Sequence, residues 1–395
     1  MPKWRDSDEK KAERFGNYDK IRRKRQLHQR SNAHDPWEKP ESEWVLGGDR
    51  GYFAARVVEV HKRYSFVSPE PVIGEIDSRD VWLATVARRH LTQKRGERNF
   101  VTVGDRVLCR PATDKDGRVE SEIPSCVLEN MAPRKSRVFR PDPMLPEREH
   151  VLAANIDQLV IVASYRAPKV RWALIDRYLV VAEEQDLPVT IVMTKEDLLD
   201  DEKFGDECRH HVDVFRSLGY RILSISMMER RRFKSVIQEI KELLAGKLTL
   251  LSGHSGVGKS SLVNLFKPEI VQEVEPEPDL KAKGRHTTTY ASLIKLGTGG
   301  YVVDTPGVRS FAMLERTALE WSHGFREMRS RTGLCKFREC RHIDEPECAV
   351  LEAKERGEID ARRYQSYVNL VLGETGRQGR LRGQEVNEEE GVEEP

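Results

Sequence analysis

The chain has 395 residues, and its 67 Lys and Arg nearly balance its 65 Asp and Glu, leaving a formal net charge of +2. This length allows two or three domains and a sizeable core. No apolar run approaches the roughly 18 residues of a membrane span, and the N-terminus lacks the apolar core of a signal peptide. We therefore expect a cytoplasmic, monomeric protein that does not bind membranes.

The two ends of the chain have compositions that cannot bury a core. Residues 1–48 are predicted to be a basic, disordered arm, because they contain few apolar residues and residues 20–30 hold six Lys or Arg and no acid. Two interpretations of this arm stay open: a solvated tail, or an arm that follows a nucleic-acid backbone. Residues 376–395 end in an acidic run and are predicted to be a disordered tail.

Residues 49–133 are predicted to form a small closed β-barrel of the oligonucleotide-binding (OB) type, with RNA as its ligand. The basic stretch at 88–98 is either a loop that contacts phosphates or an ordinary solvated loop. Short, alternating, β-branched runs predict five strands, at 54–60, 64–67, 72–76, 101–110 and 123–128.

Residues 150–313 are predicted to form an α/β domain with a doubly wound sheet, because continuous apolar strands alternate with amphipathic helices. Within it, residues 253–260 fit the phosphate-loop pattern GxxxxGK[ST] at every required position. An apolar run enters this loop and a helical run leaves it, as the mechanism requires. The predicted nucleotide-binding residues here are Gly253, His254, Ser255, Gly256, Val257, Gly258, Lys259, Ser260 and Ser261.

The chemistry of the phosphate loop assigns roles to single residues. Its glycines let successive backbone N–H groups face an anion. Lys259 would reach the β- and γ-phosphates, and the Ser260 hydroxyl would hold Mg²⁺. Downstream, a predicted strand ends in Asp304, which can reach Mg²⁺ through water, and the N–H of Gly307 can sense the γ-phosphate. Lys259 and Asp304 are therefore candidate catalytic residues.

A second motif, Thr194-Lys195-Glu196-Asp197, follows another predicted strand and has the Asn/Thr-Lys-x-Asp form that is specific for guanine. Asp197 can accept two hydrogen bonds from guanine while the stem of Lys195 packs on the base. Ser226, after a third strand, is a weaker candidate for base contact. Because the base motif precedes the phosphate loop, we expect a circularly permuted sheet.

The residues that would assist hydrolysis are less well defined. The loop at 284–289 offers a threonine hydroxyl for the metal, and Thr288 is our candidate. Val308 stands where Ras-like proteins have the glutamine that orients the attacking water, so intrinsic hydrolysis should be slow. His286 is the nearest candidate replacement in the sequence, although packing or RNA contact is an equal alternative for this histidine.

Residues 314–375 are predicted to form a helical zinc-binding domain with one structural Zn²⁺. Three cysteines and a histidine within fourteen residues suit a closed tetrahedral site, and its basic flanks are typical of RNA-facing modules. The other cysteines are scattered, which indicates a reducing compartment rather than a disulfide framework. The predicted zinc ligands are Cys335, Cys340, His342 and Cys348.

The ordered combination of these motifs resembles the ribosome small-subunit-dependent GTPase A family (RsgA, also called YjeQ), over about residues 52–372. The resemblance implies an OB domain, a permuted GTPase domain and a zinc domain that bind the small (30S) ribosomal subunit and its rRNA late in assembly. It also implies hydrolysis of GTP to GDP and phosphate that is slow alone, stimulated by the subunit and coupled to release of assembly factors. His286 corresponds to the histidine suspected of aiding hydrolysis.

The sequence departs from the pattern of this family at Met227, where a small residue is usual, and at the run 229–232 that follows it. Two other functions stay open. One is a phosphate-loop kinase or ATPase that acts on a small molecule, against which Asp197 argues. The other is a non-catalytic RNA-binding adaptor that nucleotide merely stabilises, which Val308 leaves open.

Overall fold

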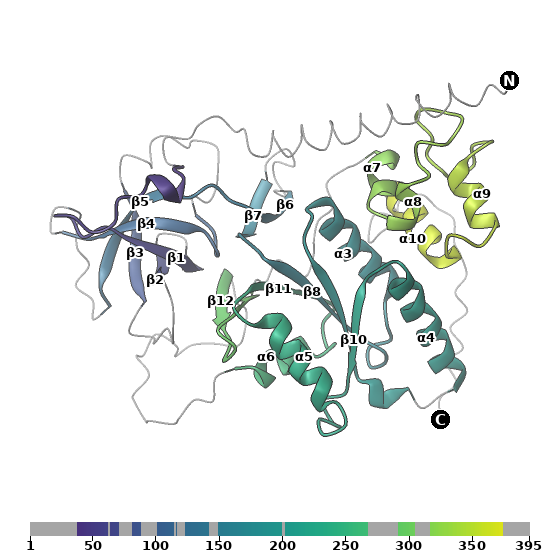
Figure 1. The fold of residues 1–395 in the computed structure, drawn as a ribbon, viewed down its shortest axis with the longest axis horizontal. Coiled ribbons are helices and arrows are strands. Elements are labelled where there is room, and N and C mark those ends of the chain that lie inside the picture. Colours follow the sequence, from purple (N-terminus) through teal and green to yellow (C-terminus); the bar gives the residue numbers. More distant parts are fainter. Residues whose placement is uncertain are drawn as a thin grey trace, which may run out of the picture. The chain divides into compact units, whose positions relative to one another are not determined.

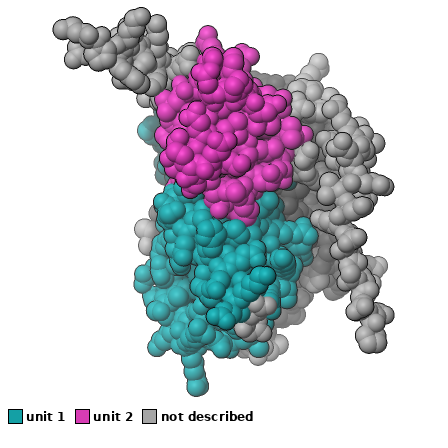
Figure 2. Space-filling view, turned by 90° about the vertical axis from the view of Figure 1, so that its right-hand side faces the viewer, with its two compact units in different colours: residues 1–314 teal, residues 315–395 magenta. Residues whose placement is uncertain are grey.

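The chain divides into two compact units, Met1–Leu314 and Glu315–Pro395, which are described separately below (Figures 1 and 2). Within the described ranges, no helix is both long and apolar enough to span a membrane. The computed structural model describes residues 38–61, 64–70, 81–87, 101–113, 116, 123–141, 149–199, 202–267, 291–304 and 317–373.

Five strands of unit 1 close into a barrel in the order β1-β2-β3-β5-β4, because β1 pairs with both β2 and β4. Alternate side chains face inward, and Val57, Val67 and Leu128 are among the fully buried ones. The predicted barrel is therefore confirmed. Its strands are β1 (Phe53–Val60), β2 (Ser65–Glu70), β3 (Trp82–Val86), β4 (Arg106–Pro111) and β5 (Ser125–Met131).

The predicted strands differ from the observed ones in two places. The strand expected at 72–76 lies outside the described residues, as does the basic stretch at 88–98, and the third barrel strand is β3. The strand expected at 101–110 begins only at β4, because Asp105 closes a turn before it. The carboxylate of Asp105 accepts a hydrogen bond of 2.7 Å from the backbone N–H of Thr102.

The end of the predicted N-terminal arm lies against the barrel. Glu38 forms a bridge with Met131 of β5, and the 3₁₀ turn η1 (Glu41–Glu43) follows. The backbone N–H of Lys39 donates to the carbonyl of Met131 (2.9 Å), and the Glu41 carboxylate lies 2.6 Å from the Arg106 guanidinium. The expectation of disorder is therefore wrong for these residues, because main-chain pairing with β5 fixes them.

The α/β part of unit 1 has its strands in the order β10-β9-β8-β11-β13-β12. All neighbours are parallel except β12, which is antiparallel to β13. Strand β9, which carries the base motif, therefore ends at the same carboxyl-terminal edge of the sheet as β11. It comes earlier in the chain than β11, as circular permutation requires. The strands are β8 (Gln158–Ser164), β9 (Val189–Thr194), β10 (Arg221–Ile225), β11 (Leu248–Ser252), β12 (Ala291–Lys295) and β13 (Tyr301–Asp304).

Helices cover both faces of this sheet (Figure 1). Because side chains alternate along a strand, β8 sends Leu159 and Ile161 into one core and Val160 and Val162 into the other. The sheet thus has an apolar core on each face, which explains the continuous apolar strands of the sequence. The first core contains α3 (Trp172–Glu184) and α4 (Glu202–Ser217), and the second contains α5 (Lys234–Leu244) and α6 (Lys259–Leu265).

Two connections that were not predicted join the barrel to the α/β part. A hairpin of β6 (Arg137–Pro141) and β7 (Glu149–Ala154) lies between them in the chain. In addition, β1 pairs with β12, with Glu59 opposite Ser292. This pairing makes the barrel and the α/β sheet one continuous sheet of eleven strands.

Gly104 determines how closely the barrel approaches the α/β part. Its φ is +89°, and a Cβ atom there would lie 2.1 Å from the carbonyl oxygen of Ala154 and 3.0 Å from Leu248. The side-chain amide of Asn155 donates to the Gly104 carbonyl (3.0 Å). Only glycine fits this position, since a side chain would meet backbone that is itself hydrogen-bonded.

Unit 2 is a small helical body with one buried ion pair. Arg363 and Glu327 are 1% and 4% exposed, and Nη2 of the arginine lies 2.9 Å from Oε2 of the glutamate. The pair joins two helices next to the buried rings of Phe325 and Tyr367. The helices are α7 (Ala318–His323), α8 (Arg326–Arg329), α9 (Ala349–Glu355) and α10 (Ala361–Val371).

We expect Gly104→Ala to lower the free energy of unfolding of unit 1 by more than about 2 kcal/mol, because the added methyl group meets a backbone carbonyl. Urea denaturation followed by tryptophan fluorescence measures this loss. The control is Gly246→Ala, since Gly246 has a φ of +64° but no atom within 4 Å of the added Cβ; it should lose about 1 kcal/mol. Equal losses would show that the close approach of Gly104 to the carbonyl of Ala154 does not affect the free energy of unfolding.

Candidate functional site

The phosphate loop connects the end of β11 to the start of α6. Gly253, Gly256 and Gly258 have φ values of +148°, +79° and +95°. A Cβ atom at Gly253 would lie 2.0 Å from the carbonyl oxygen of Val162. The glycines are therefore required for the tight curl of the loop, and this curl is what allows successive N–H groups to face a phosphate.

The ammonium group of Lys259 lies across the loop. Its Nζ donates to the carbonyls of Gly253 (2.8 Å) and His254 (2.7 Å). This position suits a cation that moves a short distance to bound phosphates. The hydroxyl-bearing Ser255, Ser260 and Ser261 are exposed at the loop, whereas Val257 is buried and anchors it in the core.

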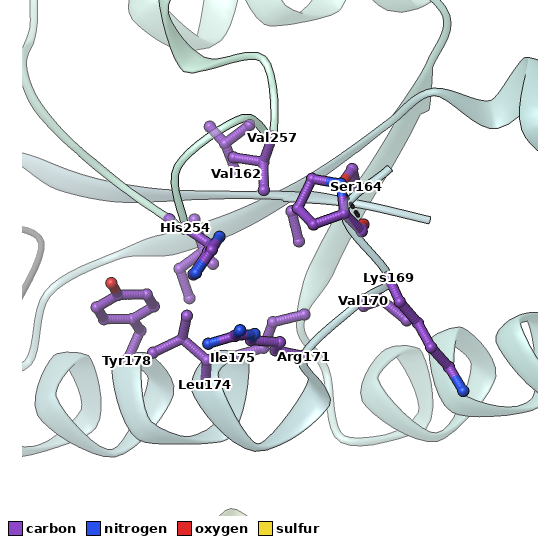
Figure 3. Close-up of a pocket in the computed structure, with 14 residues that line it drawn as sticks. Val162, Ser164, Lys169, Val170, Arg171, Leu174, Ile175, Tyr178, His254 and Val257 are labelled. Atoms are coloured by element: carbon purple, nitrogen blue, oxygen red, sulfur yellow. Dashed lines mark hydrogen bonds between the residues drawn. The ribbon is translucent and has the colours of Figure 1, made fainter. Parts of the chain in front are cut away.

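A small pocket lies behind the loop, between β8 and α3 (Figure 3). His254 points into it from the loop, Leu174 and Tyr178 line it from α3, and Lys169 points away. The Nδ1 atom of His254 lies 2.9 Å from the Ser255 carbonyl oxygen. Because its ring is directed toward α3, His254 contributes to the phosphate side of the loop through its backbone alone.

Thr194 joins the base motif to the phosphate loop. Its buried hydroxyl donates 2.6 Å to the carbonyl of Val257, which is 63 residues later in the chain, and lies 3.1 Å from the carbonyl oxygen of Ala163. A buried hydroxyl held by backbone carbonyls has one orientation, so the contact fixes the loop relative to the end of β9.

Lys195 makes a second link to the same loop. Its Nζ donates to the carbonyl of Gly256 (3.0 Å) and to that of Ala167, and its backbone is left-handed, with φ +59°. The partner loop with Ala167 was not predicted, and the signal for it was Pro168, four residues after the end of the buried strand β8. The cis bond before Pro168 is part of this loop, and Ser164 Oγ donates to the Pro168 carbonyl (2.9 Å) (Figure 3).

Asp197 and Ser226 lie on loops that leave neighbouring strands at the same edge. Asp197 is part of the 3₁₀ turn η4 (Glu196–Leu198), which follows β9. Ser226 follows β10 and is fully buried, and its Oγ accepts hydrogen bonds from the backbone N–H groups of Met228 (3.1 Å) and Glu229 (3.3 Å). The structure thus brings the base-motif and phosphate-loop residues to one edge of the sheet.

Of the remaining predicted nucleotide residues, the structure describes only Asp304. Asp304 is the last residue of β13, which is parallel to β11, so its backbone reaches the same edge as the phosphate loop. His286, Thr288 and Gly307 lie outside the described residues, as does Val308.

The predicted metal ligands come together in unit 2. Cys335, Cys340, His342 and Cys348 are buried, and their ligand atoms all lie within 4.8 Å of one another. The sulfur atoms of Cys335 and Cys348 are 3.8 Å apart, and Nδ1 of His342 is 3.4 Å from each. Ligands around a tetrahedral Zn²⁺ would be about 3.4–3.8 Å apart, given bonds of about 2.3 Å to sulfur and 2.0 Å to nitrogen. The four side chains therefore fit this ion.

The backbone around His342 is held by Glu345, which was not predicted. Its carboxylate accepts hydrogen bonds from the N–H groups of Arg341 (2.6 Å), Ile343 (2.9 Å) and Asp344 (3.3 Å). Burial raises the pKa of Glu345, but these hydrogen bonds outweigh it and lower the pKa to about 2. Glu345 is therefore ionised near neutral pH and fixes the left-handed backbone of His342, whose φ is +59°.

Two tyrosines of α10 support the same loop. The hydroxyl of Tyr364 donates to the carbonyl of His342 (2.8 Å), and that of Tyr367 donates to the carbonyl of Arg341 (2.6 Å). The hydrogen bond from Cys335 is the main reason why the pKa of Cys348 falls below that of an ordinary thiol. A thiolate in this position is ready to bind a cation.

The part of the sequence that contains the base motif and the phosphate loop is similar to a known family. A family model described as RsgA GTPase matches residues 131–314. The small ribosomal subunit biogenesis GTPase RsgA of Actinobacillus pleuropneumoniae serotype 5b is 34% identical over 345 residues, covering 87% of this chain and 91% of that protein. The protein of the same name from Chlorobaculum parvum is 39% identical over 277 residues, covering 69% of this chain and 85% of that one.

The fold is similar to two solved structures. YjeQ from Thermotoga maritima matches with a TM-score of 0.60 and 32% sequence identity, covering 83% of this chain and 100% of that chain. YloQ, described as a circularly permuted GTPase, matches with a TM-score of 0.59 and 27% identity, covering 85% and 100%.

We expect Thr194→Val to lower the affinity for GDP about tenfold, because it removes a hydrogen bond worth roughly 1–1.5 kcal/mol from the phosphate loop. Titration with a fluorescent GDP analogue measures the affinity. The control is Thr190→Val on the same strand, where the buried threonine lies at the far end from the loop. A similar loss in the control would assign the effect to strand packing instead.

We expect Glu345→Ala to weaken zinc retention by about 10- to 100-fold, as removal of an outer-shell partner usually does. Transfer of the metal from the full chain to a coloured chelator measures this change. Glu347→Ala is the control, because its exposed carboxylate pairs with Lys336 and with no other residue that the structure describes. Unchanged retention in Glu345→Ala would mean that the tyrosines alone hold the loop.

Proposed function

The chain belongs to the RsgA family of GTPases, and from that premise we propose that it binds the small ribosomal subunit and hydrolyses GTP in a subunit-stimulated manner during late assembly of that subunit. The observation that carries the proposal is the pair of links from the base motif to the phosphate loop, made by Thr194 and Lys195. These links join guanine recognition and phosphate binding in a single site.

The nucleotide in this proposal is GTP or GDP with Mg²⁺. Asp197 selects guanine, Lys259 stabilises charge on the β- and γ-phosphates, and Ser260 holds the metal with support from Asp304. Bound Mg²⁺ would neutralise charge that develops on the phosphate oxygens. The loop is already held in its curled form, so little reorganisation is needed when the charge develops.

Completion of the catalytic site is assigned to the ribosomal subunit. Val308 cannot orient water, so the chain alone hydrolyses GTP slowly. His286 is the residue of this chain proposed to assist, and Thr288 and Gly307 are proposed to contact the metal and the γ-phosphate. This division of roles explains why the chain has a complete phosphate loop but has Val308 where Ras-like proteins have the glutamine that orients the attacking water.

One structural Zn²⁺ in unit 2 belongs to the proposal, with Cys335, Cys340, His342 and Cys348 as its ligands. Their fit to a tetrahedron with no open position supports a structural ion. The metal would hold together a region whose own apolar core is small.

The remaining parts of the proposal concern partners and organisation. The proposed domains are the OB barrel (49–133), the GTPase domain (150–313) and the zinc-binding domain (314–375). The OB barrel and the zinc-binding domain are proposed to contact rRNA, and other assembly factors are further candidate partners. We also propose that the protein works in the cytoplasm as a monomer and does not bind membranes.

The test is GTP hydrolysis by the full chain alone, with large subunits and with small subunits, at fixed salt. We expect only small subunits to raise the rate, by on the order of 100-fold or more, since a completed site supplies the missing transition-state contacts. Lys259→Ala should show no stimulated hydrolysis. A rate that no subunit changes would favour the adaptor, and ATP that competes as well as GTP would favour the kinase or ATPase.

A further inference from the structure

The turn after β10 is strongly basic. Residues 228–234 contain four Lys or Arg and one acid, Glu229. This run includes the segment 229–232, at which the sequence departs from the family pattern. Most of its side chains are exposed, and it directly follows Ser226, a candidate base-contact residue.

The turn has a fixed backbone. The N–H groups of Arg232 and Phe233 both donate to the carbonyl of Glu229, over 3.0 and 3.3 Å. The ring of Phe233 is buried in the core that contains α5. The side chains that point outward are therefore presented from a rigid base, which lowers the entropy that is lost when they bind a partner.

The arginines of this turn differ in the contacts that they make within the chain. Arg232 forms an ion pair of 3.0 Å with Glu229 and lies 5.1 Å from the centre of the Phe233 ring. Nε of Arg230 donates to the carbonyl of Met227 (3.3 Å). Neither Arg230 nor Arg231 forms an ion pair in the part of the chain that the structure describes, so the Nη groups of Arg230 and the guanidinium group of Arg231 keep their donors for a ligand.

We propose that Arg230 and Arg231 form a phosphate-binding site for RNA. The inference rests on the proposed function, in which the RNA is that of the small ribosomal subunit. A guanidinium group presents a planar set of donors that matches two phosphate oxygens at once. Adjacent phosphates of one strand would offer partners to both arginines.

The apolar content of the turn favours RNA over a protein partner. Met228, which is 85% exposed, is the one large exposed hydrophobic side chain among the described residues of 149–304. A stable protein interface would need an apolar centre with several such side chains. Charge without an apolar centre is typical of contacts to a phosphate backbone.

The same turn links this site to the nucleotide. Ser226 Oγ accepts hydrogen bonds from the N–H groups of Met228 and Glu229. A phosphate held at the turn would therefore act on the loop that carries Ser226, and RNA contact would alter the release of GDP.

The test uses the full chain with Arg230→Ala and Arg231→Ala together, and purified small subunits as the probe. We expect affinity for the subunit to fall about tenfold at low salt, and the slope of log affinity against log salt to shrink by about 2, one for each lost phosphate contact. Lys203→Ala with Lys241→Ala is the control, because it removes two positive charges from exposed positions on α4 and α5. This control should leave the slope within about 0.5 of that of the unsubstituted protein.

GDP release is the second readout. Small subunits should change the release rate of the unsubstituted protein about fivefold or more, and this change should be lost in the double variant, whose GDP affinity without subunits stays normal and shows that it is folded. An unchanged salt slope in the double variant overturns the site. A loss in Met228→Ala equal to that of the double variant also overturns it, in favour of a protein contact.

The two proposals fail in different ways. If the unsubstituted protein neither binds small subunits nor is stimulated by them, the proposed function fails, and the phosphate site falls with it. If the unsubstituted protein is stimulated normally and the double variant binds with the same salt slope, only the phosphate site is wrong.

Discussion

The nucleotide site depends on hydrogen bonds, one of them buried, between two motifs that are far apart in the chain. The hydroxyl of Thr194 and the ammonium of Lys195 both bind carbonyls of the phosphate loop, at Val257 and Gly256. A glycine-rich loop has many accessible conformations, and these contacts select one of them before any ligand is present. The strand with the base motif therefore shapes the phosphate site as well as the base site.

The continuous sheet also connects the barrel to the strands that carry the nucleotide site. Strand β12 pairs with β13 on one side and with β1 of the barrel on the other, and β13 ends in Asp304. Close contact at Gly104 adds a second attachment, since the backbone of the barrel meets that of Ala154 there. These two attachments hold the barrel at a defined position relative to the strands of the phosphate loop and of Asp304, which a flexible linker could not do.

Unit 2 combines its apolar core with buried polar and charged groups. The buried pair of Arg363 and Glu327 and the cysteine and histidine cluster take the place of a larger core. Removal of one partner from such a pair is costly, whereas the intact pair mainly specifies which helices meet. Glu345 and the α10 tyrosines then fix the ligand loop by hydrogen bonds to its backbone. Unit 2 is thus organised by polar groups with defined geometry.

The sequence by itself determined the α/β class, the five-stranded barrel, the family and the members of the two binding motifs, because each depends on local spacing or on strand periodicity. The tertiary structure decided what depends on contacts between distant residues. The strand β3, the pairing of β1 with β12, the carbonyl of Ala167 and the carboxylate of Glu345 all gain their roles from partners that no local pattern identifies. In each of these contacts at least one partner is a backbone group, and backbone groups are the same in every residue, so the sequence cannot reveal which of them pair.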